Sequence, residues 1–320
     1  MKTEISSIQL KFKEKLIAVQ NTKGLKNHEI ATITGRSEST VSEILRDKRA
    51  FADNLIHSML TMLNDYMQDG DLVTSLRQYT IMMNIAKLGK EAHDMRLIVG
   101  NTGIGKSVVF KKFAAENKAC FYFKIDRHYS WNKFLLEINR VMGIDVEKRT
   151  TNALLDNIIR KSEQLSNDNP KLIIDEAEII NKCIWKNLKN LRTATEDLLS
   201  IDIVGITDVK NTIAKMAGLE IVRYNKNENQ TCYTEYFKPR RDENNIYTTF
   251  ARRLKVFHIT TPTDYDIEDF CRTKGITNKK VIELACQRWW NYAMADNAVK
   301  KAVSMGLDLS QLSLDEFEML

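Results

Sequence analysis

Residues 100–107 read GNTGIGKS, and this octapeptide restricts the possible folds of the chain more than any other stretch. It meets the pattern G-x-x-x-x-G-K-[ST], in which the glycines let backbone N–H groups converge on phosphate groups. The pattern carries this meaning when a strand precedes the loop and a helix begins inside it. The apolar stretch 97–99 and the helical pattern over 105–117 meet both conditions, so the sequence predicts a phosphate-binding loop.

The side chains of this loop have defined roles toward ATP and Mg²⁺. Lys106 is expected to reach the β- and γ-phosphates, and the Ser107 hydroxyl is expected to bind Mg²⁺. Backbone N–H groups around them should hold the remaining phosphate oxygens. The residues predicted to contact the nucleotide are Gly100, Asn101, Thr102, Gly103, Ile104, Gly105, Lys106, Ser107 and Val108.

Two acids follow the third apolar stretch of the chain, about 70 residues further on, in Leu172-Ile173-Ile174-Asp175-Glu176. Asp175 is predicted to hold Mg²⁺ together with Ser107. Glu176 is predicted to orient and activate the water that attacks the γ-phosphate. Acids also follow strands as N-caps of helices, and that alternative stays open.

A site that hydrolyses ATP also needs groups that sense the γ-phosphate and neutralise its developing charge. Thr207 and Asp208 lie at the end of a fourth apolar stretch and are the candidates for sensing. Arg252 and Arg253 precede a fifth stretch and are the candidates for neutralising charge, on the phosphate of a neighbouring subunit. A pair of surface arginines is the alternative for the second pair.

Strand-like and helix-like patterns alternate through the middle of the chain. Strands are predicted at 97–99, 121–125, 172–174, 201–206 and 256–259. Helices are predicted at 72–89, where Gly89 ends the helix, and at 105–117, 131–142, 151–165, 178–196 and 208–217. This order predicts an α/β fold with a parallel five-stranded sheet between two layers of helices. Residues 219–249 are polar, lack periodicity and are predicted to be an insertion.

The two ends of the chain are predicted to be helical domains. A polar stretch with a glycine, residues 68–71, indicates a hinge. We therefore expect an N-terminal domain over 1–70, a core over 71–262 and a C-terminal helical domain over 263–320. We find no internal repeat in the sequence.

Residues 25–48 have the spacing of a helix-turn-helix unit. Gly35 lies at the turn, Ser37 can cap the second helix, and residues 38–46 form the predicted recognition helix. The residues predicted to contact DNA are Ser39, Thr40, Ser42, Arg46 and Lys48. A helical domain for protein contacts is the alternative, and the nearly balanced charge of residues 1–70 favours it.

Basic residues recur at helical spacing after the acidic pair. Lys182, Lys186, Lys189 and Arg192 follow one another at i, i+4, i+7 and i+10. Such a stripe can bind phosphates of duplex DNA without sequence preference. A solvated helix face is the alternative. A weaker basic candidate lies in the predicted insertion, at Lys238, Arg240 and Arg241.

Composition adds limits on partners and compartment. The formal net charge is +6, and the excess of basic residues lies in the middle of the chain. The five cysteines are scattered without the spacing of a zinc site or a disulfide framework. No apolar run is long enough to span a bilayer, so we expect a cytoplasmic protein without membrane contact.

The motifs together resemble those of the AAA+ ATPases, and most closely the family of DNA-transposition ATPases that includes the phage Mu B transposition protein, TnsC and IstB. The resemblance is carried by GNTGIGKS, LIIDEAE, IDIVGITD and DIEDFCRTKGI, and it covers most of the chain. It implies an AAA+ core with a helical lid over 263–320 and an arginine finger at Arg253. It places Ala293 where a lid arginine is usual, which puts lid-mediated sensing in doubt. The polar stretch 219–249 also departs from the phage Mu protein.

The resemblance further implies an ATPase that binds double-stranded DNA without sequence preference and whose activity DNA stimulates. Its partners would be a transposase and further copies of the same chain in a helical filament or ring. Two functions remain as alternatives: a helix-turn-helix DNA-binding regulator switched by nucleotide, and an ATPase that loads a helicase.

Overall fold

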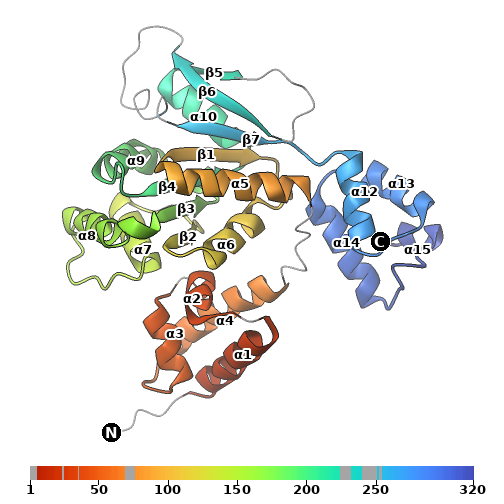
Figure 1. Ribbon diagram of the computed structural model, residues 1–320, viewed down its shortest axis with the longest axis horizontal. Helices are drawn as coiled ribbons and strands as arrows, with labels where there is room; N and C mark the ends of the chain where they lie inside the picture. Colours follow the sequence, from red (N-terminus) through yellow and green to blue (C-terminus); the bar gives the residue numbers. More distant parts are fainter. Residues whose placement is uncertain are drawn as a thin grey trace. The chain divides into compact units, whose positions relative to one another are not determined.

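The computed structural model describes residues 6–23, 25–34, 36–68, 76–223, 232–239, 251 and 254–320. The chain divides into two compact units. The first comprises Met1–Asp69, Gly89–Met95 and Phe110–Ile203, and the second comprises Gly70–Leu88, Arg96–Val109 and Val204–Leu320. Figure 1 shows the helices and strands of both units with their labels.

One mixed sheet contains seven strands in the order β2-β3-β4-β1-β7-β6-β5. The strands are β1 (Met95–Gly100), β2 (Cys120–Lys124), β3 (Lys171–Asp175), β4 (Ser200–Gly205), β5 (Leu219–Arg223), β6 (Cys232–Pro239) and β7 (Lys255–Ile259). Strands β2, β3 and β4 pair in parallel, as do β1 and β7. All residues of β1, β3 and β4 are buried, as expected for inner strands of a covered sheet.

The helices lie close to where the periodicity predicts them. They are α1 (Ser7–Lys23), α2 (Asn27–Thr34), α3 (Glu38–Leu45), α4 (Asp53–Gln68), α5 (Arg77–Ala92), α6 (Lys106–Glu116), α7 (Trp131–Val141), α8 (Thr151–Gln164), α9 (Lys182–Ala194), α10 (Asp208–Ala217), α12 (Asp264–Thr273), α13 (Lys279–Arg288), α14 (Tyr292–Ser304) and α15 (Leu314–Glu318). Helices α7, α8 and α9 pack against one another within the first unit. Helix α10 packs against β5 within the second.

The predicted five-stranded parallel sheet is wrong, because two further strands extend it. Strands β5 and β6 pair with each other and with β7 in antiparallel fashion, within the stretch that we predicted to be an insertion. Residues Glu235 and Phe237 are buried while Tyr236 and Lys238 are exposed, which is the alternation of a half-buried strand. The sequence of β6 looked irregular because one of its inward-facing positions is occupied by a carboxylate, Glu235. Glu235 is 7% exposed and pairs with the Lys210 ammonium at 2.5 Å.

Two predicted helix boundaries are also wrong. Helix α5 continues past Gly89 to Ala92 and ends where His93 adopts a left-handed backbone with φ of 48°. A glycine inside a helix costs only about 1 kcal/mol, and flanking residues can carry the helix through it. Helix α9 begins at Lys182 rather than near residue 178. The Asn181 side chain accepts a hydrogen bond from the backbone N–H of Ile184 and caps its start.

Helices α1 to α4 form a bundle around their own apolar core. The buried residues include Phe12, Leu16, Ile30, Val41, Ile44, Ile56, Met59 and Leu63, and Ala115 of α6 joins them. The predicted cap at Ser37 is confirmed at the start of α3. The Ser37 hydroxyl accepts a hydrogen bond from the backbone N–H of Thr40 at the start of α3. The turn residue Gly35 lies outside the described residues.

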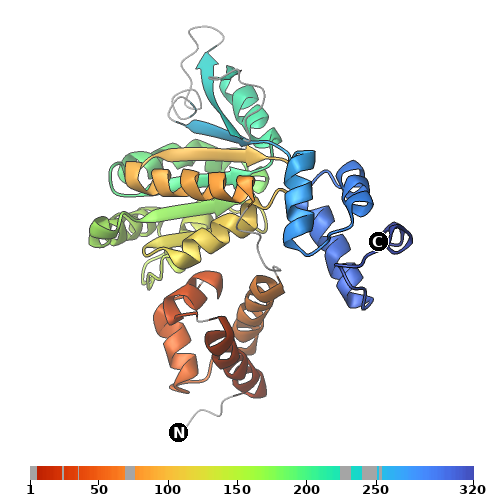
Figure 2. The ribbon, with the colours of Figure 1, turned by 45° about the vertical axis from the view of Figure 1, so that its right-hand side comes forward.

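Helices α12 to α15, which Figure 2 draws in blue, enclose a second apolar cluster in the second unit. It includes Phe270, Trp289, Tyr292 and Phe317. The Gln78 side chain of α5 donates to Asp266 of α12 at 3.1 Å and accepts from the Tyr292 hydroxyl of α14 at 2.5 Å. These two hydrogen bonds fix α5 against the C-terminal helices. Among the described helices, none combines the length and the apolar character that crossing a membrane requires.

Candidate functional site

The loop between β1 and α6 has the backbone that the phosphate-binding motif requires. Gly103 and Gly105 have φ of +80° and +89°, which residues with a side chain rarely adopt. A Cβ atom on Gly100 would lie 2.5 Å from Ile104 Cδ1 and 2.7 Å from the Ile259 carbonyl oxygen, so β7 also requires a glycine there. The glycines of the motif are therefore needed for backbone shape and close packing.

Lys106 and Ser107 begin α6 directly after this loop. The Lys106 side chain is 8% exposed, and its ammonium donates to the carbonyl oxygens of Gly100 at 2.8 Å and Asn101 at 2.9 Å. The first N–H groups of a helix have no partner within the helix and favour anions. A buried cation, a helix N-terminus and glycines with positive φ fit the phosphates of a nucleotide.

The acidic pair lies at the end of β3 in the first unit. Asp175 is 2% exposed and accepts a hydrogen bond from the Tyr122 hydroxyl at 2.5 Å and from the backbone N–H of Glu176 at 2.9 Å. Glu176 has a left-handed backbone with φ of 61°, and its carboxylate lies 3.4 Å from the Lys124 ammonium. A non-glycine residue in this conformation costs about 1–3 kcal/mol and is concentrated at functional sites.

The alternative that these acids only cap a helix is not favoured. The Glu176 side chain makes no capping hydrogen bond to the short 3-10 helix that follows, Ala177–Ile179. The next α-helix is capped by Asn181 instead. Asp175 is held by β2 through Tyr122, which sequence reasoning missed, although a tyrosine on a predicted strand beside the acidic strand is a usable signal.

The structure separates the two candidates for sensing the γ-phosphate. The Thr207 hydroxyl donates to the Asn101 side-chain oxygen of the phosphate-binding loop at 3.2 Å. Asp208 is exposed and accepts from the Asn211 amide at 3.4 Å. Thr207 is therefore the residue that contacts the loop. Arg252 and Arg253, the candidates for neutralising charge, lie outside the described residues.

The C-terminal helices also contact this loop within the second unit. The backbone N–H of Ala293 donates to the Gly103 carbonyl oxygen at 3.0 Å. The Asn291 carboxamide lies so close that a Cβ atom on Gly103 would be 2.7 Å from its Cγ and Oδ1. Asn291 also caps α14 by accepting from the Met294 N–H at 2.9 Å. Sequence reasoning singled out Ala293 but missed Asn291, whose place before a helix was the available signal.

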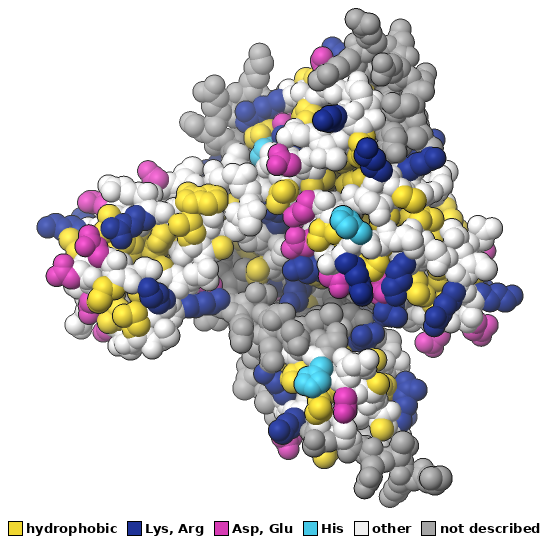
Figure 3. Space-filling model, turned by 180° about the vertical axis from the view of Figure 1, so that it is seen from behind, with side chains coloured by type: hydrophobic (Ala, Val, Ile, Leu, Met, Phe, Trp, Pro, Cys, Tyr) yellow, Lys and Arg dark blue, Asp and Glu magenta, His cyan; other side chains and the backbone are white. Residues whose placement is uncertain are grey.

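The basic stripe lies on α9. Lys182 and Lys186 are exposed and Lys189 is half-buried, while the opposite face of the helix buries Ile184, Trp185, Leu188 and Leu191. Arg192 differs from the lysines because one of its guanidinium nitrogens is buried and has no hydrogen-bond partner among the described residues. The exposed part of the stripe therefore consists of Lys182 and Lys186. Figure 3 shows Lys and Arg side chains at several places over one face of the chain, interspersed with hydrophobic and acidic side chains.

The candidate DNA contacts of the N-terminal bundle lie on and just after α3. Ser39, Arg46 and Lys48 are exposed, and Thr40 and Ser42 are half-buried. The Ser37 hydroxyl contacts those of Ser39 at 2.7 Å and Thr40 at 2.9 Å, so part of their hydrogen-bonding capacity is used locally.

Comparison with known proteins supports the nucleotide site. A model of the AAA domain family matches residues 90–213, which include the phosphate-binding loop, the acidic pair and Thr207. Comparison with curated proteins finds no match. Among solved structures, the chain is similar to C. elegans PCH-2, with 12% sequence identity and a TM-score of 0.31. That alignment covers 72% of this chain and 58% of PCH-2. On the family match and the geometry of the loop, the chain contains an AAA-type ATPase domain.

Proposed function

We propose that the chain binds and hydrolyses ATP, and that the energy of ATP binding controls its assembly on duplex DNA during DNA transposition. The observation that carries the first part is the glycine-shaped loop with buried Lys106, which lies in the stretch matched by the AAA domain family. The DNA and transposition parts rest on the lysines of α9 and on the resemblance of the motifs to transposition ATPases.

Each residue of the site has a different proposed role in ATP hydrolysis. Lys106 would bind the β- and γ-phosphates. Ser107 and Asp175 would hold Mg²⁺, which would supply positive charge to the phosphates. Tyr122 orients the Asp175 carboxylate through its hydrogen bond. Glu176 accepts the proton of the attacking water. Lys124, whose ammonium lies 3.4 Å from the Glu176 carboxylate, holds that carboxylate in position.

Glu176→Gln tests the hydrolytic part. The amide cannot act as a base but keeps the size of the side chain, so ATP affinity should stay within about twofold of wild type. Because general-base catalysis contributes about 10²–10⁴-fold, turnover should fall by that factor. Nucleotide affinity is measured by calorimetry and turnover by phosphate release. Turnover near the wild-type rate would refute the role of Glu176.

The α9 lysines are proposed to contact the DNA backbone. Changing Lys182, Lys186 and Lys189 to Ala should weaken binding of duplexes of any sequence and should flatten the dependence of affinity on salt concentration. The matched control changes three exposed lysines of the C-terminal helices, Lys279, Lys280 and Lys301. Equal DNA affinity for the two triple variants, measured with ATP present, would exclude the α9 stripe.

Assembly on DNA and activation of a transposase are proposed from the sequence resemblance. Electron microscopy with duplex DNA and a slowly hydrolysed ATP analogue should show helical oligomers that coat the DNA. Glu176→Gln should prolong them, because hydrolysis drives disassembly in this proposal. Addition of the protein should stimulate strand transfer by a transposase from the same source. DNA-free single particles would contradict the proposal.

A nucleotide-switched regulator is the second candidate, favoured by the capped α3 helix of the N-terminal bundle. A regulator protects one discrete site in a footprint, whereas a DNA-coating ATPase protects duplexes in proportion to their length. Capture of a replicative helicase instead of a transposase would identify a helicase loader.

A further inference from the structure

A cavity of 470 Å³ in the first unit lies between the start of α3 and the connection from α7 to α8. Ser37 and Thr40 line it from the side of α3, and Gly143 and Asp145 line it from the connection. Ser37 approaches that connection closely, because its Cβ lies 3.6 Å from where a Cβ on Gly143 would be. The start of α3 therefore faces this cavity and the α7–α8 connection.

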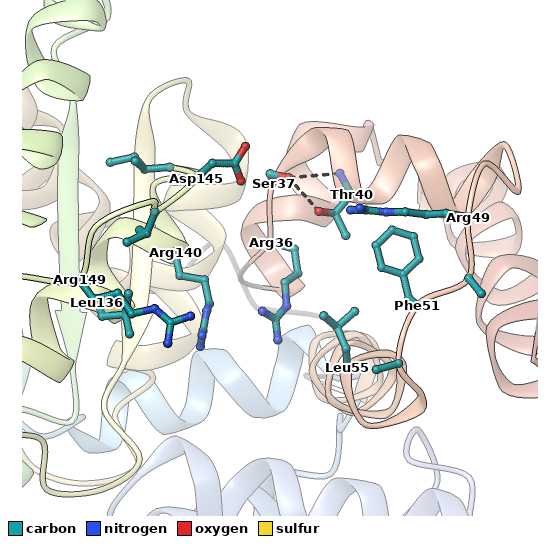
Figure 4. Close-up of a pocket in the computed structure, with 15 residues that line it drawn as sticks. Arg36, Ser37, Thr40, Arg49, Phe51, Leu55, Leu136, Arg140, Asp145 and Arg149 are labelled. Atoms are coloured by element: carbon teal, nitrogen blue, oxygen red, sulfur yellow. Dashed lines mark hydrogen bonds between the residues drawn. The ribbon is translucent and has the colours of Figure 1, made fainter. Parts of the chain in front are cut away.

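Three guanidinium groups extend into one region of this cavity. Figure 4 shows the side chains of Arg36, Arg140 and Arg149 directed toward one another. Arg140 donates to Glu137 on its own helix at 2.7 Å. The Arg36 Nε is buried, and no acceptor among the described residues lies within hydrogen-bonding reach of it. Burial, and next the charge of Arg140, lower the pKa of Arg36, which Glu137 offsets in part.

This arrangement suits an anion from outside the chain. Like charges that converge in a cavity repel one another, and a bound phosphate removes that repulsion while it accepts hydrogen bonds from several guanidinium groups. The Ser37 and Thr40 hydroxyls at the same cavity can donate to phosphate oxygens as well. Arg49, which also lines the cavity, is held by Glu43 at 2.8 Å and over the Phe51 ring at 4.6 Å.

A second cavity of 550 Å³ continues this basic surface. It shares Gly143, Ile144 and Asp145 with the first cavity. Its basic residues are Lys148, Arg160 and Lys161, and its acidic residues are Asp145 and Glu147. Basic groups spread over two adjoining cavities fit a chain of phosphates better than one small anion.

We infer that the two cavities bind the phosphodiester backbone of DNA, with Arg36, Arg140 and Arg149 contacting one phosphate group. This inference rests on the proposed DNA-binding function and assigns it a further site, in addition to the α9 lysines. It also gives the start of α3 a role in backbone contact instead of the base reading that a recognition helix performs. Backbone contact carries no sequence information, which agrees with binding that is independent of sequence.

The test compares wild type with Arg36→Gln/Arg149→Gln, in which glutamine keeps hydrogen-bonding capacity but removes both charges. The matched control is Arg272→Gln/Arg288→Gln, which removes two charges from α12 and α13. Affinity for two duplexes of equal length and different sequence is measured by fluorescence anisotropy at several salt concentrations with an ATP analogue. Each neutralised phosphate contributes about 0.9 to the slope of log K against log salt. Because Arg36 and Arg149 are proposed to contact the same phosphate, the cavity variant should lower that slope by about 0.9.

The expected result is an equal loss of affinity for both duplexes in the cavity variant, with unchanged ATP affinity and an unchanged control. Arg149→Gln alone should lower the slope in the same direction but by less than the double variant. Because Arg149 is exposed, this variant tests the site without the risk of misfolding. An unchanged slope in variants of a DNA-binding protein overturns the site alone, whereas no DNA binding by wild type overturns the proposed function. Loss of binding to inorganic phosphate without any change toward DNA would identify a free-anion site and overturn the inference.

Discussion

The contact between Gly103 and Asn291 gives a prediction whose size follows from the structure. Gly103 and Gly105 have nearly the same φ, +80° and +89°, but their surroundings differ. A Cβ on Gly103 meets the Asn291 carboxamide at 2.7 Å, whereas a Cβ on Gly105 meets no atom of the described residues within 4 Å. Alanine at either position carries the same backbone strain, so a comparison of the two isolates the contact with Asn291.

The expected costs can be worked out separately. Gly105→Ala should cost about 1–2 kcal/mol, the strain of a left-handed backbone in a residue with a side chain. Gly103→Ala should cost that amount plus about 1–3 kcal/mol for overpacking against Asn291. Asn291→Ala should cost about 1 kcal/mol, because α14 loses its N-cap. In Gly103→Ala/Asn291→Ala the overpacking disappears, so the double variant should be less destabilised than the sum of the single variants by about 1–3 kcal/mol.

Native-state hydrogen exchange of the α14 amides measures these free energies where the contact lies. Gly105→Ala combined with Asn291→Ala serves as the control cycle and should be additive, because Gly105 has no contact with that side chain. Equal costs for Gly103→Ala and Gly105→Ala, together with additivity in both cycles, would refute the reasoning. A measured coupling would show that the nucleotide loop and the C-terminal helices respond to each other.

Three further predictions concern the acidic site and the core. Tyr122→Phe removes the hydrogen bond that orients Asp175. The Mg²⁺ concentration for half-maximal ATP hydrolysis should therefore rise by about 10- to 100-fold. An unchanged Mg²⁺ titration would contradict this role of Tyr122. Lys171→Met should lower the free energy of unfolding, measured with urea, by about 3–5 kcal/mol, because Asp202 stays buried without the ammonium that lies 2.6 Å away. Adding Asp202→Leu should recover most of that free energy. Burial acts to raise the pKa of Glu235, but a histidine and a lysine beside it outweigh burial and lower that pKa. The ionised Glu235 should therefore add its full contribution to the free energy of unfolding above its unfolded pKa of about 4.5, and this contribution should be lost as pH falls below that value. In Glu235→Gln, the free energy of unfolding should decrease less on acidification than in wild type.

Local patterns were enough to predict most elements of the nucleotide site. The spacing of glycines, Lys106 and Ser107 predicts a strand, a loop and a helix, because only that backbone presents N–H groups to phosphates. The apolar run before Asp175 predicts a buried strand for the same local reason. The N-cap at Ser37 follows from a hydroxyl placed before a helical pattern.

Predictions that depended on distant partners were less successful. Strand β6 was read as part of an insertion because Glu235 faces the core. The positions of Lys210 on α10 and His258 on β7 make that burial tolerable. Gly89 was expected to end a helix that continues for three more residues. The sequence left Thr207 and Asp208 as equal candidates, and the hydrogen bond to Asn101 distinguishes them.

The sequence by itself determined the chemistry of the loop at residues 100–107, because that chemistry depends on neighbouring residues and their backbone conformation. The tertiary structure decided which residues surround that loop and the acids. Tyr122 reaches Asp175 from another strand, Asn291 reaches Gly103 from a helix nearly 190 positions further along the chain, and Arg36 meets Arg140 across a cavity. Such contacts are set by how strands pair and helices pack, and no periodicity within one segment records them.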